Sequence, residues 1–309
     1  MMKLFQDKPG PGMELLIFGL LIFLSFFVTL FLSMLLAMPL FGLGMEELQA
    51  VMGNATDESN LDVLRYLQII NQIGLFILPA LLFGILLKRN FVYYFHFERE
   101  VAWKSLLAVF LLLFTILPLI NFLAHLNSSI NLPDSLAGLE NWMKNQEQAA
   151  QQLTGKFLEV TDVKGFLVNF LMIAILPAIG EELFFRGALQ QIFTRWFKNA
   201  HVAIIVTSVL FSALHLQFFG FFPRFLLGVI FGYLFYWSRS IWLPIFAHFV
   251  NNGAAVVVAF MAARGQIAVG MEDFGNYNGT TWIIIINSIF SALLIYYVYS
   301  TEVRGIRSE

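Results

Sequence analysis

The sequence predicts an all-α, polytopic membrane protein of about eight transmembrane helices around a polar intramembrane cavity, and two observations support the membrane assignment. Hydrophobic residues make up 59% of the 309 residues and charged residues only 12%, with a mean hydropathy of +0.77. Soluble domains have roughly 45–50% apolar and about 25% charged residues. The apolar residues also gather into runs of about twenty, long enough to cross a bilayer core of about 30 Å.

Eight apolar runs predict the spans. The run at 163–195 is too long for one straight span, and Pro177 and Gly180 predict a kink within it. Two of the later runs are short, which is typical of helices packed inside a bundle or ending at a cavity. In chain order, the runs cover residues 14–42, 62–87, 102–125, 163–195, 201–217, 223–238, 241–263 and 281–300.

We expect a single membrane domain over residues 1–309, because no internal repeat or second domain is visible. Residues 126–162 are the only long hydrophilic stretch, an outer polar loop within which Asn141 to Leu153 favours a small outer helix or a cap. The net charge of −2 argues against a nucleic-acid partner and leaves the lipid bilayer as the expected surroundings. The chain has no cysteine, which excludes disulfides, thiol nucleophiles and thiolate metal sites.

The distribution of basic residues predicts the topology. Cytoplasmic loops of membrane proteins are enriched in Lys and Arg. With both termini in the cytoplasm, inside segments hold 11 such residues and outside segments hold 6, which is the expected asymmetry. The inside residues are Lys3, Lys8, Lys88, Arg89, Arg99, Lys104, Arg195, Lys198, Arg239, Arg304 and Arg307, and the outside residues are Arg65, Lys144, Lys156, Lys164, Arg224 and Arg264.

Ionisable side chains within the predicted spans mark the candidate site. Inserting one such side chain into the bilayer centre costs about 2.5–3.5 kcal/mol, so its presence there indicates a structural or functional role. In the segment GEELFFRG, Glu182 and Arg186 are four residues apart and share a helix face, which predicts an ion pair. Glu181 is rotated by about 100° from Glu182 and has no such local partner. We therefore assign chemistry to Glu181 and structural support to Glu182 and Arg186.

Two histidines and an asparagine reach a similar depth on other helices. At about 1.5 Å per residue from the cytoplasmic end, Glu181 and His215 each lie about 21 Å deep, Asn252 about 16 Å and His248 about 10 Å. His248 and Asn252 are four residues apart, so both can face one cavity. A histidine on an apolar helix is also compatible with plain packing, and the asparagine with interhelical hydrogen bonding. The common depth predicts one buried polar site.

Two chemistries fit these side chains. A carboxylate and an imidazole that share a water molecule can deprotonate it for attack on a carbonyl carbon. A second imidazole and a carboxamide supply donors to the resulting oxyanion. The competing chemistry is a zinc site on Glu181, His215 and His248 with an open position for water, although the sequence lacks the HExxH zinc helix.

Three short motifs at these positions resemble the CPBP family, which includes the CAAX prenyl endopeptidases and the bacterial Abi-type immunity proteins. The family pattern is EExxxR, then FxxxH, then HxxxN, and it is matched by EELFFR (181–186), FSALH (211–215) and HFVNN (248–252). The resemblance covers roughly residues 166–263, within a core segment of 162–263. It implies an eight-helix fold whose four core helices enclose a conical cavity.

The resemblance also implies a role for each motif residue. Glu181 and His215 are expected to activate water, and His248 and Asn252 to stabilise the oxyanion. The chain is therefore expected to be an intramembrane endopeptidase of the cell membrane that acts on a peptide or membrane-associated protein. The alternative is a non-catalytic immunity factor or maturation scaffold that binds a partner peptide. A transporter is disfavoured because no repeats or paired broken helices are present.

The resemblance further implies that Glu182 and Arg186 organise the site. The family is often labelled metallopeptidase, yet its better-supported mechanism is a glutamate-activated water without a catalytic metal. We therefore expect no cofactor. Zinc bound by Glu181, His215 and His248 remains the alternative.

Overall fold

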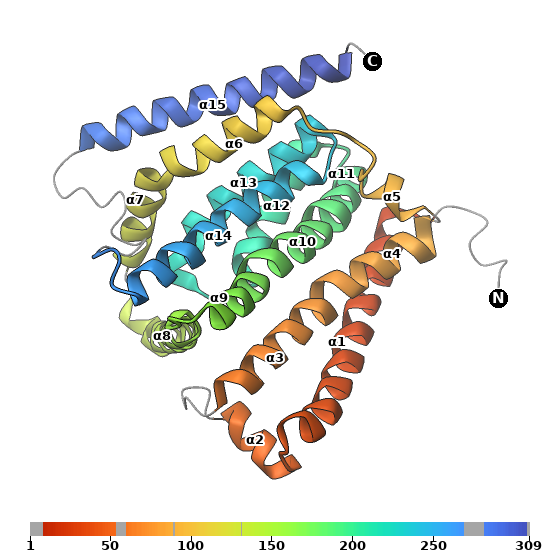
Figure 1. Cartoon of the computed structure of the whole chain (residues 1–309). Helices are drawn as coiled ribbons and strands as arrows, with labels where there is room; N and C mark the ends of the chain where they lie inside the picture. The colour runs from red at the N-terminus through yellow and green to blue at the C-terminus, as the bar shows by residue number, and fades with distance from the viewer. Residues whose placement is uncertain (1–8, 54–59, 89, 131, 269–280, 308–309) are drawn as a thin grey trace.

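The computed structural model describes residues 9–53, 60–88, 90–130, 132–268 and 281–307, and over these residues the chain is helical with no strand (Figure 1). The helices and their bounds are α1 (Pro11–Phe41), α2 (Met45–Gly53), α3 (Leu61–Gln72), η2 (Ile73–Ile77), α4 (Leu78–Lys88), α5 (Phe91–Tyr94), α6 (Trp103–Thr115), α7 (Leu117–Ser128), η3 (Asp134–Leu136), α8 (Ala137–Leu158), α9 (Val163–Asn169), η4 (Phe170–Ile175), α10 (Leu176–Glu182), η5 (Leu183–Gln190), α11 (Gln191–Phe197), α12 (Ala200–Ala213), η6 (Phe218–Gly220), α13 (Phe221–Ser238), α14 (Trp242–Ala263) and α15 (Thr281–Arg307).

The all-α membrane fold is confirmed, with a helix count close to the predicted eight. Within the described residues, six helices are long and apolar enough to cross a membrane, and α6 with α7 makes a seventh bent by 43°. Pro118 explains the bend, because it has no N–H to donate to the carbonyl of Phe114. The fifth predicted run, 201–217, forms a helix shorter than the predicted span. Its helix α12 has 14 residues, a length of about 21 Å.

The long fourth run forms one continuous helical rod from Val163 to Phe197. Its irregularity takes the form of two π-helical stretches, η4 and η5, on either side of α10. Single π-helical turns inside α-helices shift the hydrogen-bond register and are frequent at functional sites. The carboxylates of Glu181 and Glu182 lie at the end of the α10 turn between them.

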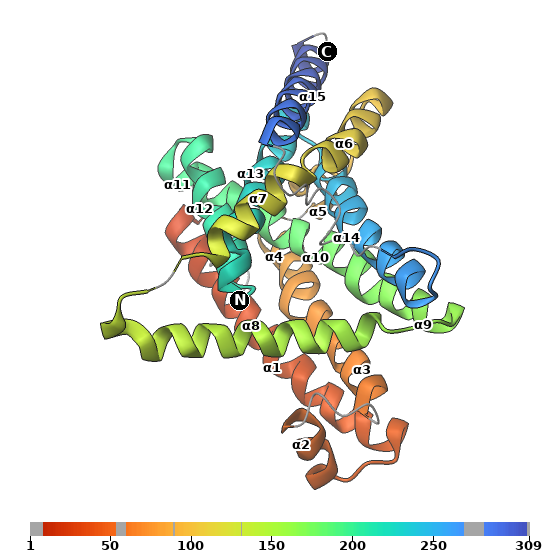
Figure 2. The same cartoon turned by 90° about the vertical axis from the view of Figure 1, so that its left-hand side faces the viewer.

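Hydrogen bonds and an ion pair show which loops lie together at each end of the bundle. At one end Arg195 contacts Glu14, and Ser240 Oγ donates to the Arg99 carbonyl. At the other end Arg65 donates to the Phe157 carbonyl. The start of α1 and the end of α15 lie toward the first end in both views (Figures 1 and 2).

Helix α8 crosses the bundle on the side of its second end, and α2 with the adjoining ends of α1 and α3 extends past it (Figure 2). It occupies most of the predicted outer polar loop and contacts α3, α9, α14 and η6. Its side chain Glu147 is buried, and Oε2 accepts a hydrogen bond of 3.2 Å from the backbone N–H of Phe219 in η6. The outer stretch thus forms an ordered crossing helix of 22 residues above the membrane helices.

Two glycines of α13 set its close approach to α12. A Cβ on Gly228 would lie 3.1 Å from Ser208 Cβ, and one on Gly232 would lie 2.8 Å from Ile204 Cγ2. Small residues spaced by four allow such contact between membrane helices. The bare backbone also leaves the Gly228 and Gly232 carbonyls open to Arg186 Nη2 (2.9 Å) and Gln190 Nε2 (3.0 Å).

We expect Gly232→Ala to destabilise the protein by about 1–3 kcal/mol, the usual cost of overpacking. The added methyl group would meet both Ile204 and Gln190 Oε1. Thermal unfolding in detergent, followed by tryptophan fluorescence, measures the effect. Gly19→Ala is the matched control, because a Cβ at this exposed position of α1 meets nothing within 4 Å. Equal midpoints for the two variants would contradict the packing argument.

Candidate active site

One cavity of about 470 Å³ lies between α3, α8, α10, α13 and α14, and all four predicted catalytic residues line it. Its volume falls within the range of about 300–1,000 Å³ that is usual for ligand pockets. Helix α8 covers it with the side chains of Ala150, Leu153, Thr154 and Phe157. The cavity therefore lies next to α8, away from the end of the bundle with the start of α1.

Glu181 is buried in the wall of this cavity, with 7% of its surface exposed. Its Oε1 accepts a hydrogen bond of 3.2 Å from Gln72 Nε2 on α3. Within the described parts of the chain, Oε2 has no hydrogen-bond partner and lies 4.0 Å from His215 Nε2. One carboxylate oxygen is thus held in place while the other faces an imidazole nitrogen.

His215 lies in the turn after α12, two residues beyond the helix end at Ala213. This differs from the expectation of a continuous helix over 201–217, because Leu216 adopts a left-handed φ of 53° that ends the helix. The His215 Nδ1 is 2.7 Å from the Phe211 carbonyl oxygen, which can only accept. Nδ1 therefore carries the proton, and a neutral His215 presents the Nε2 lone pair toward Glu181.

Glu182, Arg186 and His248 form a second, buried cluster, in which His248 also lines the cavity. Glu182 Oε1 accepts from Arg186 Nη1 at 2.7 Å and from His248 Nδ1 at 2.8 Å. Glu182 and Arg186 have no exposed surface. The guanidinium also lies over the rings of Phe211 and Phe231, at 4.7 and 5.4 Å from the ring centroids. The ion pair predicted from the spacing is therefore present, and it also positions His248.

Asn252 extends from α14 to the π-helical stretch η4. Its Nδ2 donates to the Ile173 carbonyl at 3.0 Å, and its Oδ1 accepts from Asn251 Nδ2 at 3.0 Å. In an α-helix the donor to the Ile173 carbonyl would be the N–H of residue 177, but that residue is a proline. Pro177 thus leaves an acceptor that orients Asn252, whose second amide hydrogen is available to the cavity.

The described residues hold no preformed ligand set for zinc. Among the described residues no group of three or more His, Asp or Glu side chains has metal-binding geometry. The Nδ1 of His248 lies 2.8 Å from Glu182 Oε1, and Glu181 Oε2 lies 4.0 Å from His215 Nε2. Zinc requires ligands at about 2.0–2.2 Å from one point.

Several polar residues of the cavity were not predicted from the sequence. Gln72 holds Glu181, and Gln68 lies one helical turn before it in the lining. Their spacing of four within an apolar run could have marked this polar stripe. Arg224 and Gln217 also line the cavity, although Arg224 was assigned only to an outer segment.

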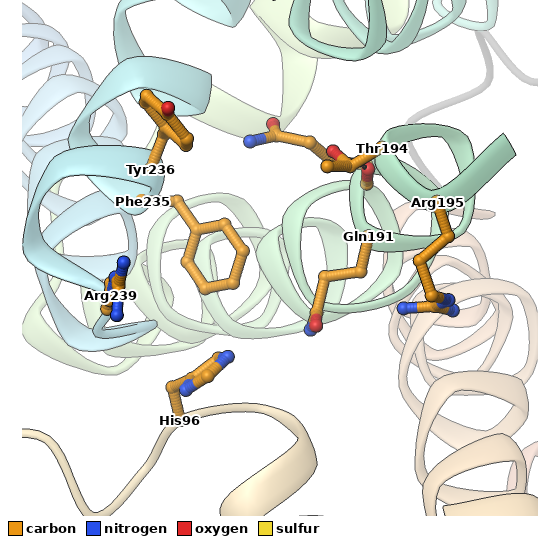
Figure 3. A pocket seen from close by; sticks show the side chains of 8 residues that line it. His96, Gln191, Thr194, Arg195, Phe235, Tyr236 and Arg239 are labelled. Atoms are coloured by element: carbon orange, nitrogen blue, oxygen red, sulfur yellow. Dashed lines mark hydrogen bonds between the residues drawn. The ribbon is translucent and has the colours of Figure 1, made fainter. Parts of the chain in front are cut away.

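A second cavity, of about 330 Å³, lies at the end of the bundle that holds Arg195 and Arg239. Figure 3 shows these arginines with His96, Gln191 and Phe235 around it. Burial, the largest influence, lowers the pKa of His96 below its usual value. The lining of this cavity, within the described residues, includes no Asp or Glu, so it lacks a carboxylate base. The candidate active site is therefore the cavity around Glu181.

Comparison with known proteins agrees with the motifs. Residues 163–254 match the family model described as type II CAAX prenyl endopeptidase Rce1-like, and this segment contains all six motif residues of the site. No curated protein matches the chain significantly, and no solved structure does. The matched segment runs from α9 to the middle of α14 and so forms the wall that carries both carboxylates. In this segment the chain is similar to the type II CAAX prenyl endopeptidases, in agreement with the resemblance of its motifs to the CPBP family.

Proposed function

We propose that this protein is an intramembrane endopeptidase that hydrolyses a peptide or membrane-associated protein with a water molecule activated by Glu181 and His215. The observation that carries the proposal is the Glu181 Oε2 atom. It is buried, faces a cavity, lies 4.0 Å from His215 Nε2 and has no other partner within the described residues. A carboxylate oxygen and an imidazole nitrogen so placed can hold one water molecule between them.

In the proposed reaction, Glu181 takes a proton from this water as the hydroxide oxygen bonds to the scissile carbonyl carbon. His215 Nε2 accepts a hydrogen bond from the same water and orients it. The carbonyl oxygen becomes an oxyanion, which donors in the cavity stabilise. The C–N bond then breaks, and the leaving amine takes the proton from Glu181.

The arrangement of His248 supports its role as an oxyanion donor. Because Nδ1–H donates to Glu182, only a protonated imidazole has an N–H on Nε2 to offer. The Glu182 carboxylate that accepts from Nδ1–H is placed to stabilise such a positive charge on the ring. The remaining amide hydrogen of Asn252 is the second donor.

Cleavage of a quenched-peptide library by the purified protein tests the proposal and its independence of metal. We expect wild-type cleavage to survive a strong chelator and to disappear in Glu181→Ala. Cleavage that is lost on chelation and restored by zinc would instead support a metallopeptidase. Equal cleavage by wild type and Glu181→Ala, or none by either, would favour the non-catalytic scaffold.

We also propose that both termini face the cytoplasm and that the cavity opens outward through the α8 side of the cell membrane. The 11 to 6 distribution of basic residues supports this orientation. Because the chain has no cysteine, single cysteines report it directly. A membrane-impermeant maleimide added to intact cells is expected to label Lys144→Cys on α8 and to spare Lys198→Cys after α11. The reverse pattern would invert the topology.

A further inference from the structure

Arg224 is a cation of the active-site cavity that the proposed mechanism does not use. It lies in the first turn of α13 and, among the described lining residues, is the one Lys or Arg. Arg186, which lies near the same cavity, has no exposed surface and is paired with Glu182. A permanent positive charge therefore faces the space in which a substrate would lie.

The backbone around Arg224 is shaped to hold its guanidinium. Nη1 donates to the Gln217 carbonyl at 2.9 Å, and Nη2 donates to Gln217 Oε1. A Cβ on Gly220 would lie 2.4 Å from Arg224 Nη1 and 2.9 Å from Cζ. The absence of a side chain at this position is what lets the guanidinium rest on the backbone.

The guanidinium keeps unused donors. A guanidinium has five N–H groups, and Gln217 accepts from two of them. The carboxylates of Glu147 and Glu181 interact with it electrostatically, but within the described chain neither lies within 4.0 Å in an ion pair. One oxygen of each is bonded elsewhere, Glu147 Oε2 to the Phe219 N–H and Glu181 Oε1 to Gln72. The position of a directly bound carboxylate is therefore open.

We propose that Arg224 determines specificity by binding a carboxylate of the peptide substrate. This proposal rests on the proposed function, because the bound peptide is the one presented to Glu181. Arginine binds carboxylates through paired, charge-assisted hydrogen bonds. The carboxylate belongs either to an acidic side chain or to the C-terminus of the peptide.

A purely structural role predicts different behaviour. Arg224 also holds Gln217, which follows Leu216 at its left-handed φ of 53° and lies two residues from His215. If Arg224 served only to hold this turn, its loss would slow the cleavage of every peptide equally through kcat. If Arg224 recognises the substrate, its loss raises KM for peptides with a carboxylate and leaves KM for neutral peptides unchanged.

The test uses four fluorescent versions of one apolar decapeptide: neutral with an amidated end, with one internal Glu, with the matching internal Gln, and with a free C-terminus. Binding is measured by anisotropy in a Glu181→Gln background, so the result does not depend on cleavage. We expect a carboxylate to improve Kd about tenfold or more and Arg224→Gln to remove that gain. The internal Glu and free-end peptides separate the two sources.

Two further variants separate recognition from folding. Gly220→Ala keeps the charge but displaces the guanidinium, and with φ of −103° at Gly220 the backbone accepts alanine. It is expected to lose the carboxylate preference as Arg224→Gln does. Arg264→Gln removes one charge at the exposed end of α14, and this variant should retain the carboxylate preference. Equal binding of all four peptides by wild type, or a preference retained in both Arg224→Gln and Gly220→Ala, overturns the proposal.

Discussion

Replacing Arg186 with methionine is expected to destabilise the protein by about 3–5 kcal/mol, the usual cost of leaving a buried charge without its partner. Glu182 has no exposed surface, and its Oε1 would keep only the bond from His248. Arg186 also donates to the Gly228 carbonyl, so α13 would lose a contact as well. Thermal unfolding in detergent measures the loss.

The double variant Glu182→Gln with Arg186→Met separates folding from chemistry. Removing both charges together should restore most of the stability, because replacing a whole buried ion pair is often neutral. Cleavage should stay low, because the carboxylate that supports a protonated His248 is gone. A double variant that is as unstable as Arg186→Met would contradict the ion-pair explanation, and one with full activity would contradict the role of Glu182.

Changing Glu181 to glutamine is expected to lower kcat by about 10²–10⁴-fold, the range of a general base, with little effect on folding. Glutamine has nearly the same shape, and its side-chain oxygen can still accept from Gln72 Nε2. Its amide group has no lone pair of comparable basicity to take the proton from water. Steady-state kinetics on a peptide cleaved by the wild type measures the effect.

Gln72→Leu is the matched comparison, because it removes the hydrogen bond that positions Glu181 and keeps the base. It should reduce kcat much less than Glu181→Gln does. The idea of a glutamate base would be abandoned if Glu181→Gln cleaved at the wild-type rate.

The local part of the site could be predicted from the sequence, and the long-range part could not. The spacing of four residues predicted the Glu182–Arg186 pair, which the structure has at 2.7 Å. Hydropathy predicted the positions of the helical runs, because lipid requires long apolar segments. Both inferences depend only on residues close in sequence.

The remaining contacts join residues far apart in the chain. Glu182 and His248 are 66 residues apart, Gln72 and Glu181 are 109 apart, and Ile173 and Asn252 are 79 apart. Helical spacing shows which residues share a face, but it does not show which faces meet. The prediction therefore found the catalytic candidates while missing Gln72 and the second partner of Glu182.

The shortness of α12 has a consequence for the surrounding bilayer. Helix α12, about 21 Å long and with Val202, Ile205 and Val209 exposed, is shorter than a hydrocarbon core of about 30 Å. Lipids next to it must compress, at a modest cost for each ångström of mismatch. This thinning brings the headgroup layer toward the turn that carries His215. A polar peptide backbone and the hydrolytic water then have less hydrocarbon to cross, so activity should be higher in vesicles of shorter acyl chains.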